Sequence, residues 1–366
     1  MDFITQNKQI IDILQKLLNN DCLLCGSIKK ILVNHDLSDL RICYPEDKEI
    51  DFLALFDDIK QFKYKQLSET ETLWIINDIE FTTTNKLNKN DVYISKNGIS
   101  IIGQSKQKSI DVLKYFRVTE SEDCDRMKVT ISWLKYLMNA DNYVYGSWPT
   151  RYILNDCSDC DENNERDIDL CTTDKNKIRQ LMTALECSGI CQIDNNVGKY
   201  DIKPLNARIK LEGWNLIFDI HEESKNMSCD AFYNNLKLTN DYVTINYEPD
   251  NLSFIESLIL TFNDLFYNQY TLIKPIPNQF QNKSDFRLLL KPFLFSTTKE
   301  ISYDYLEEND QNIRKLNDVV TDHICEKHKN SDNLEYPIMN MCLNMNKEVK
   351  KSWCLNCIQD HVLQKK

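Results

Sequence analysis

The sequence has no long hydrophobic run and very little glycine. Only seven of its 366 residues are glycine. The apolar stretch at residues 254–262 is among the longest, yet it contains Glu256 and falls well short of the roughly 20 residues that a membrane span needs. Residues 1–8 predict the start of an amphipathic helix and not the apolar core of a signal peptide. We therefore expect a soluble, intracellular protein of the cytoplasm without a membrane partner.

The sequence also lacks an excess of positive charge. It has 44 Lys and Arg against 56 Asp and Glu, which gives a net charge of -12 and a pI near 5.0. A general nucleic-acid coat is thereby excluded, because basic residues must outnumber acids on a phosphate-binding face. A local basic groove remains open. With 42% hydrophobic and 10% aromatic residues, the chain is globular and long enough for two or three domains.

Cysteine is abundant, with 14 residues. Such a number suggests a disulfide framework in a secreted protein, but the absence of a signal peptide argues against that interpretation. We expect most cysteines to be reduced thiols in a core, with a few candidate metal ligands.

An internal repeat appears when the chain is aligned with itself at an offset of 120 residues. Residues 11–27 and 131–147 then align without a gap, and both predict a helix, a polar turn, a buried strand and a Gly-Ser turn. Identical residues occupy the following positions: Ile11/Ile131, Leu14/Leu134, Leu17/Leu137, Asn19/Asn139, Asp21/Asp141, Gly26/Gly146 and Ser27/Ser147.

Further matches follow in the same order along the chain. They pair residues 48–52 with 166–170, residues 74–80 with 214–222, and residues 90–95 with 240–245. Their common order predicts a duplication, with one module at residues 1–118 and a second at 119–250. A helical segment with a Cys/His cluster is expected at residues 251–366.

The second module contains the residues that suggest chemistry. Gly146 and Ser147 follow a predicted strand, where glycine allows backbone to approach phosphate and the serine hydroxyl with the turn amides offers donors to a triphosphate.

Three carboxylates follow this turn. Asp167 and Asp169 alternate around Ile168, so on a strand both project from one face. Two neighbouring carboxylates repel unless a cation lies between them, and Mg²⁺ or Mn²⁺ suits such oxygen ligands. Asp219, at the end of an apolar run, is the candidate third ligand and would help to deprotonate an attacking hydroxyl.

This pattern resembles the nucleotidyltransferase superfamily, whose best-known member is DNA polymerase beta. The family signature is Gly-Ser or Gly-Gly after a strand, an acidic-x-acidic pair on the next strand and a third acid later, here Gly146-Ser147, Asp167-x-Asp169 and Asp219. The Asn/Lys/Ile bias resembles members encoded by giant DNA viruses, which implies the host cytoplasm or the virion as the location. The implied fold is α+β, with two tandem modules that each have a mixed sheet flanked by helices.

The first module offers a second copy of the site. Its candidates are Gly26, Ser27, Glu49, Asp51 and Asp78. We expect this copy either to be degenerate and structural or to be a second active site.

Other residues near the two sites carry weaker signals. Glu80 competes with Asp78 for the third acidic position, and His35 is interpreted as a surface residue. His221 shares the strand face of Asp219 and is expected to be structural. Arg151 and Lys199 are candidates for triphosphate contacts.

One departure from the family pattern lies between the turn and the acidic pair. The connection, residues 148–166, has 19 residues and is longer than is usual in the family. Its polar residues 155–165 predict a surface loop. Cys157 and Cys160 within it are interpreted as free thiols rather than zinc ligands.

The C-terminal segment contains two pairs with chelating spacing, Cys325-x-x-His328 and Cys354-x-x-Cys357. Such pairs form structural zinc sites. Against zinc, residues 313–328 also predict one helix on which Cys325 and His328 merely share a face. Alternative ligands are available at three positions: His323, Cys342 and His361.

The preferred function is Mg²⁺-dependent nucleotidyl transfer from an NTP to a hydroxyl acceptor, with release of pyrophosphate. The acceptor is left open between an RNA end, a protein side chain and a small molecule. The alternatives are a non-catalytic scaffold of this fold that binds a nucleotide or a partner protein, and a zinc-dependent interaction protein.

Overall fold

The chain forms two compact units in the computed structural model, Met1–Tyr267 and Asn268–Lys366. The structure describes residues 2–26, 30–45, 48, 50–56, 59, 62–76, 78–87, 92–101, 124–138, 142–154, 166–188, 192–194, 205–211, 213–222, 229–267, 269–273, 300–302, 320–324, 337–342 and 350–354.

The first unit is built on one mixed sheet, which has 14 strands among the described residues. Its first half consists of β1 (Leu23–Cys25), β2 (Arg41–Cys43), β3 (Phe62–Ser68), β4 (Glu71–Ile76), β5 (Ile79–Thr84), β6 (Val92–Ser95) and β7 (Gly98–Ile101). Its second half consists of β8 (Asn142–Val144), β9 (Arg166–Thr172), β10 (Gln192–Asp194), β11 (Leu205–Leu211), β12 (Leu216–Glu222), β13 (Leu236–Leu238) and β14 (Val243–Ile245).

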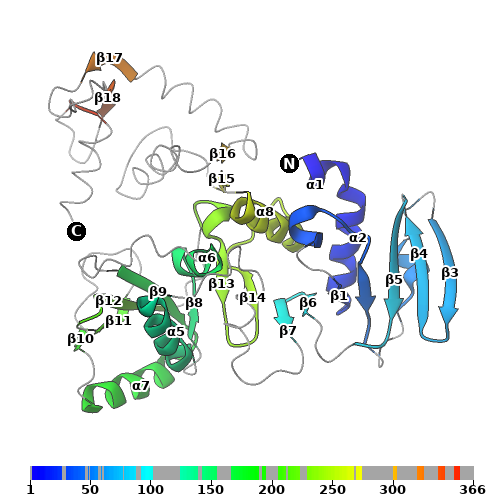
Figure 1. The fold of residues 1–366 in the computed structure, drawn as a ribbon, viewed down its shortest axis with the longest axis horizontal. Helices are drawn as coiled ribbons and strands as arrows, with labels where there is room; N and C mark the ends of the chain where they lie inside the picture. Colours follow the sequence, from blue (N-terminus) through cyan, green and yellow to red (C-terminus); the bar gives the residue numbers. More distant parts are fainter. Residues whose placement is uncertain are drawn as a thin grey trace. The chain divides into compact units, whose positions relative to one another are not determined.

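The two halves have the same strand order and the same pairing directions. From the centre outward, the first half runs β7-β6-β1-β2-β5-β4-β3 and the second runs β14-β13-β8-β9-β12-β11-β10. In each half the third and fourth strands pair antiparallel and the fourth and fifth pair parallel. The halves join where β14 pairs antiparallel with β7, which makes the sheet continuous (Figure 1).

Helices accompany the strands of both halves. In the first half they are α1 (Asp2–Gln6), α2 (Lys8–Asn19), the π-helical turn η1 (Lys30–Asn34) and α3 (Phe52–Leu55). In the second half they are α5 (Asp125–Met138), α6 (Ser147–Leu154), α7 (Lys175–Ser188) and the 3-10 turn η2 (Phe232–Asn234), followed by α8 (Phe254–Phe266).

The helix and the strand predicted within residues 11–27 and within residues 131–147 are confirmed. Helix α2 leads through a turn to β1, and α5 precedes β8 in the chain, with residues 139–141 between them outside the described residues. The apolar side chains that set the helical period are buried, including Leu14 and Leu17 in α2 and Leu134 and Leu137 in α5.

Two of the other repeat matches pair residues that occupy different places in the sheet. Trp74 lies in β4, whereas Trp214 lies in the turn before β12. Residues 92–95 form β6, whose counterpart by strand order is β13, but the matched residues 240–245 include β14. These similarities are therefore local resemblances of strand composition, which any half-buried strand shares.

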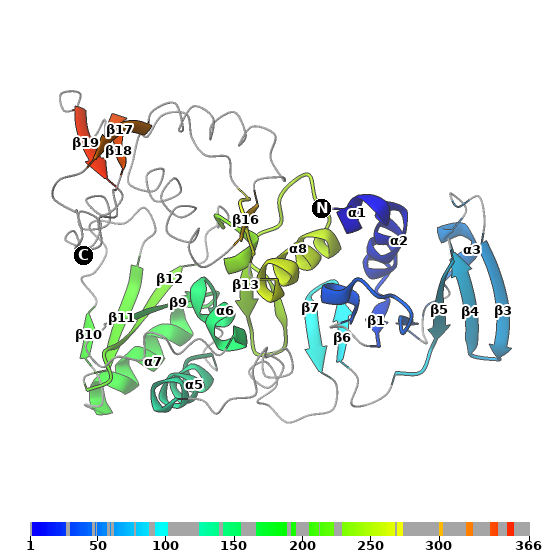
Figure 2. The same ribbon diagram turned by 45° about the horizontal axis from the view of Figure 1, so that its top comes forward.

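Helix α8 packs against both halves, because it contacts α2 and η1 of the first and η2 and β14 of the second. Figures 1 and 2 show it between the two halves. A capping box fixes its start, with the Ser253 side chain accepting from the Glu256 amide and the Glu256 carboxylate accepting from the Ser253 amide. Glu256 is only 3% exposed and accepts a 2.7 Å hydrogen bond from Lys8 Nζ, which ties α8 to α2.

The second unit differs from the helical segment that the sequence predicts. Its described elements are strands: β15 (Gln269–Thr271) pairs parallel with β16 (Glu300–Ser302), and β18 (Pro337–Cys342) pairs antiparallel with β17 (Val320–Ile324) and β19 (Lys350–Cys354). The helix predicted over residues 313–328 is thus wrong at β17. β-Branched Val320, Thr321 and Ile324 favour a strand there. Helix α8, expected in the C-terminal segment, belongs to the first unit.

Within the part of the chain that the structure describes, no helix is long and apolar enough to cross a membrane.

We predict that Glu256→Gln destabilises the first unit by about 1–3 kcal/mol, because it removes the charge of a buried carboxylate that accepts hydrogen bonds from Lys8 and from Ser253. Burial alone would raise the pKa of Glu256, but the hydrogen bonds from Lys8 and Ser253 hold that pKa below 4.5. The lowered pKa means that the stabilisation is complete above pH 4.5 and is lost as the pH falls through the lowered value. Urea unfolding of both proteins, repeated from neutral to acidic pH, measures the effect.

The matched control is Asp12→Asn, which removes the exposed partner of the same lysine, 2.9 Å away. We expect it to change stability by less than about 0.5 kcal/mol. Equal losses for the two variants, or a Glu256→Gln loss that does not shrink in acid, would contradict the prediction.

Candidate functional site

The Gly-Ser turn lies between β8 and α6. Gly146 has a φ of +76°, a left-handed conformation that favours glycine. Ser147 is exposed and is the first residue of α6, and Pro149 stands in the first turn, where its missing N–H breaks no helical hydrogen bond. The first amides of a helix have no partner within the helix, so this helix start and the serine hydroxyl offer donors to an anion.

The acidic residues lie on two neighbouring strands. Asp167 and Asp169 belong to β9, and Asp219 belongs to β12, which runs parallel to β9 with Asp219 opposite Asp169 in the register. Between and beside the acids, Ile168 and Leu170 are 3% and 0% exposed, so the opposite face of β9 forms the core. The alternation predicted from the sequence is confirmed, except that Asp219 lies within its strand and not at its end.

The turn and the acidic pair meet on one face of the sheet. The Tyr145 amide donates to the Asp169 carbonyl at 3.2 Å, which aligns the end of β8 with β9. A Cβ atom added to Gly146 would lie 3.1 Å from Asp169 Oδ2. The backbone conformation therefore favours glycine at residue 146, and any larger residue would also require the Asp169 carboxylate to shift.

Basic and aromatic side chains surround the acids. Arg208 of β11 donates to both oxygens of Asp219, with Nε–Oδ1 and Nη2–Oδ2 distances of 2.6 Å each. His221 Nε2 lies 3.4 Å from Asp169 Oδ1. Burial, followed by the negative charges of Asp169 and other neighbours, raises the pKa of Tyr145, so its hydroxyl stays protonated. The face thus carries three carboxylates, with one of them neutralised by an arginine.

Arg208 was not among the residues that the sequence indicated. It alternates with apolar residues in the strand segment 205–211, a pattern shared by many solvated strands. Its importance comes from the pairing of β11 with β12, which places it opposite Asp219. Sequence spacing gives no information about that register.

The oxygen donors of this face fit a divalent cation in part. Asp167 is exposed and the Asp169 side chain is 39% exposed, so a hard cation can reach both. Both carboxylate oxygens of Asp219 accept hydrogen bonds from Arg208. Asp219 could therefore bind a cation only if at least one of these hydrogen bonds were broken. Accordingly, the described residues include no group of three Asp, Glu, His or Cys side chains already arranged around one ion position.

The first half has a different set of residues at the equivalent positions. Its turn glycine, Gly26, has a φ of +112°, and an added Cβ would contact the Asp39 carbonyl. Cys25 lies opposite Arg41 in the register of β1 and β2, which matches the position of Tyr145 opposite Asp169 in the second half. Arg41 also lies opposite Thr82 of β5, which matches the position of Asp169 opposite Asp219. The counterparts of Asp167, Asp169 and Asp219 are therefore Asp39, Arg41 and Thr82.

The second-copy acids predicted from the sequence do not occupy these places. Asp51 is the N-cap of α3, where its side chain accepts from the Ala54 amide at 3.0 Å. Asp78 lies in the turn before β5 with a φ of +63°. Glu49 and Ser27 lie outside the described residues. Residues 48–52 resemble β9 in sequence, but they come after β2 in the chain and are not part of the strand that corresponds to β9. This is why the predicted acids do not lie at the positions equivalent to Asp167 and Asp169.

Several other candidates cannot be placed in the site. Lys199, Cys157 and Cys160 lie outside the described residues, as do three of the zinc candidates, Cys325, His328 and Cys357. Cys354 is the last residue of β19. Arg151 lies in the last turn of α6.

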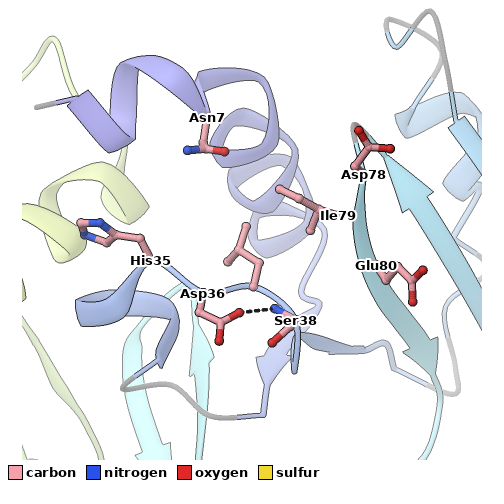
Figure 3. A pocket seen from close by; sticks show the side chains of 8 residues that line it. Asn7, His35, Asp36, Ser38, Asp78, Ile79 and Glu80 are labelled. Carbon is pink, nitrogen blue, oxygen red and sulfur yellow. Dashed lines mark hydrogen bonds between the residues drawn. The ribbon is translucent and has the colours of Figure 1, made fainter.

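A separate pocket of about 380 Å³ opens in the first half (Figure 3). It lies between Asn7, the segment 35–38 after η1 and residues 78–80 at the start of β5. Asp36 lines one wall, and Asp78 and Glu80 line another. Among the described residues that line it, three are acidic and none is a lysine or an arginine, and this negative charge opposes the binding of a triphosphate.

Comparisons with known proteins give distant likenesses in structure. Two solved structures of a tRNA-processing enzyme are each 12% identical to this chain. The apo form has a TM-score of 0.34, and the match covers 55% of this chain and 49% of the enzyme chain. The form with CTP has a TM-score of 0.29, and the match covers 48% of this chain and 42% of the enzyme chain. The chain thus spans about half the length of that enzyme. The Megavirus polyadenylate synthase is 11% identical, with a TM-score of 0.22 over 86% of this chain and 77% of its own. No family model and no curated protein matches. These three TM-scores are all below 0.5, so the likenesses carry no inference about function.

We predict that Gly146→Ala destabilises the first unit by about 2 kcal/mol, because it combines a strained φ with a displaced Asp169 carboxylate. Gly213→Ala is the matched control. Gly213 has a φ of +83°, but nothing lies within 4 Å of an added Cβ, so only the backbone cost of about 1 kcal/mol is expected. Chemical denaturation measures both. Equal costs would mean that Asp169 does not approach the turn as described.

Proposed function

We propose that the second half of the first unit is the catalytic module of a nucleotidyltransferase. The reaction is the attack of an acceptor hydroxyl on the α-phosphate of an NTP, with release of pyrophosphate. The observation that supports it is the meeting, on one sheet face, of the Gly146-Ser147 turn, the Asp167/Asp169 pair and Asp219. Phosphoryl transfer requires little besides positioning and neutralisation of charge, and this face offers donors for phosphate beside acids for a cation.

Each group has a role that its position suggests. The turn amides and the Ser147 hydroxyl bind triphosphate oxygens at the start of α6. Asp167 and Asp169 hold Mg²⁺ or Mn²⁺, which when bound neutralises phosphate charge and lowers the pKa of the acceptor hydroxyl. Once its carboxylate is released from Arg208, Asp219 serves as the third cation ligand and helps to deprotonate the acceptor hydroxyl. Gly146 leaves space for Asp169 to approach the turn.

We further propose that the two halves arose by duplication and that only the second is active. The equal strand order of the halves supports a duplication. Arg41 at the position of Asp169 brings a positive charge to the place of a metal ligand, and Thr82 at the position of Asp219 offers no carboxylate. Asp39, at the position of Asp167, forms an ion pair with Lys30. The first half is therefore the structural copy.

The acceptor is proposed only as a hydroxyl of an RNA end, a protein side chain or a small molecule. The net charge of -12 makes a long nucleic acid a less suitable acceptor than a short one, because extended phosphate binding needs a basic surface.

One observation favours a second candidate, a scaffold that binds nucleotide without catalysis. Arg208 holds both oxygens of Asp219, so the third acid is already neutralised. A scaffold of this kind would bind an NTP and release no pyrophosphate. Any zinc-dependent role involves ligands mostly outside the described residues, and chelation followed by a folding assay would test it separately.

We predict that the double variant Asp167→Asn/Asp169→Asn lowers nucleotidyl transfer by about a thousandfold or more, because it removes both cation ligands but preserves side-chain volume. The assay incubates the full chain with each α-labelled NTP, Mg²⁺ or Mn²⁺ and a mixed pool of acceptors. Incorporated label and released pyrophosphate are measured together.

The matched control is Asp39→Asn, which changes the equivalent residue of the first half. We expect its activity to remain within about twofold of the wild type, because an exposed ion pair contributes little. Transfer that survives in the Asp167/Asp169 variant would refute the site, whereas NTP binding without transfer in the wild type would favour the scaffold.

A further inference from the structure

We propose that Arg208 exchanges between two partners, neutralising Asp219 before substrate binds and contacting the triphosphate afterwards. This inference rests on the proposed function, which it extends by assigning a substrate-binding residue. The guanidinium of Arg208 and the incoming cation compete for the same carboxylate.

The first argument is geometric. Residues 208 and 219 are direct partners in the antiparallel register of β11 and β12, and the guanidinium binds the carboxylate through two parallel hydrogen bonds of 2.6 Å. Both oxygens of Asp219 are therefore directed toward Arg208. A cation that is ligated by Asp219 needs at least one of these oxygens, so the arginine must release one or both.

The second argument concerns burial. The Asp219 side chain is 8% exposed, whereas the Arg208 side chain is 34% exposed. A carboxylate so deeply buried requires a compensating charge at all times, which Arg208 supplies in the absence of a cation. The more exposed arginine is the partner that has room to move. Its planar fork matches phosphate oxygens as well as carboxylate oxygens.

The third argument is the balance of charge on the face. Asp167, Asp169 and Asp219 bring three negative charges close together, and Arg208 returns one positive charge. A divalent cation would neutralise two further charges and repel the guanidinium at short range. The negative charge of an entering triphosphate offers the displaced guanidinium a new partner within the same site.

Lys210 provides a comparison on the same strand face. It lies two residues from Arg208, but its register partner on β12 is Ile217, which carries no charge. Its place in the register therefore differs from that of Arg208, which lies opposite Asp219. A change at Lys210 removes the same unit of charge without touching Asp219.

The experiment measures two binding affinities, and removal of Arg208 should raise one of them and lower the other. The first is Mn²⁺ binding without nucleotide, followed by electron paramagnetic resonance of the free ion. The second is the binding of a non-hydrolysable NTP analogue in Mn²⁺-saturated protein, followed by calorimetry. For Arg208→Gln we expect Mn²⁺ affinity to rise about tenfold and analogue affinity to fall about tenfold, because the variant removes a competitor of the cation and a ligand of the phosphate.

Two control variants separate this effect from a loss of structure. Lys210→Gln should change both affinities by less than about twofold. Adding Asp219→Asn to Arg208→Gln should return Mn²⁺ affinity to the wild-type value, because the gain requires the released carboxylate. If Arg208→Gln does not fold, as judged by its melting transition, Arg208→Lys replaces it with the same signs expected, because a lysine cannot hold both oxygens.

The outcomes distinguish the two proposals. Mn²⁺ affinity that is the same in the wild type and in Asp167→Asn/Asp169→Asn would overturn the proposed function. Mn²⁺ binding that is lost in that variant but unchanged in Arg208→Gln would overturn only the exchange of Arg208. A fall in both affinities for Arg208→Gln would also overturn it, because that result indicates a purely structural ion pair.

Discussion

The candidate site depends on one constraint: two carboxylates occupy neighbouring positions on parallel strands, and one of them is buried. Asp169 and Asp219 are partners in the register of β9 and β12, and the cost of placing negative charge there must be offset. The surrounding features meet this requirement. Arg208 neutralises Asp219, Asp169 remains accessible, and Gly146 leaves room for the Asp169 side chain.

Local features of the chain were predictable from the sequence, and long-range pairings were not. The apolar period of residues 11–27 and 131–147 predicted the helices and strands correctly, and the alternation around Ile168 predicted two acids on one face. By contrast, the position of Arg41 as the counterpart of Asp169, and the pairing of Asp219 with Arg208, depend on which strands are neighbours and in which register they pair. Residues 48–52 resembled β9 in composition alone, and composition does not record pairing.

Comparison of the two halves suggests which parts of the fold the chemistry needs. Both halves keep the turn glycine with a positive φ and the same order of strands. They differ at the face beside that turn, where the first half has Arg41 and Thr82 and the second has Asp169 and Asp219. Equal strand geometry with different side chains indicates that this fold accommodates either set of residues beside the turn, whereas packing constrains the strands.

The antiparallel junction of β7 and β14 has a consequence for the second half that does not depend on the acidic residues. Val243 of β14 has Ile99 of β7 as its partner. If the second half stood alone, β14 would become a terminal strand with unsatisfied amides and carbonyls, which invite pairing with other chains and aggregation. The first half pairs with that border through β7, so it satisfies the backbone of β14 whatever side chains lie beside its own turn.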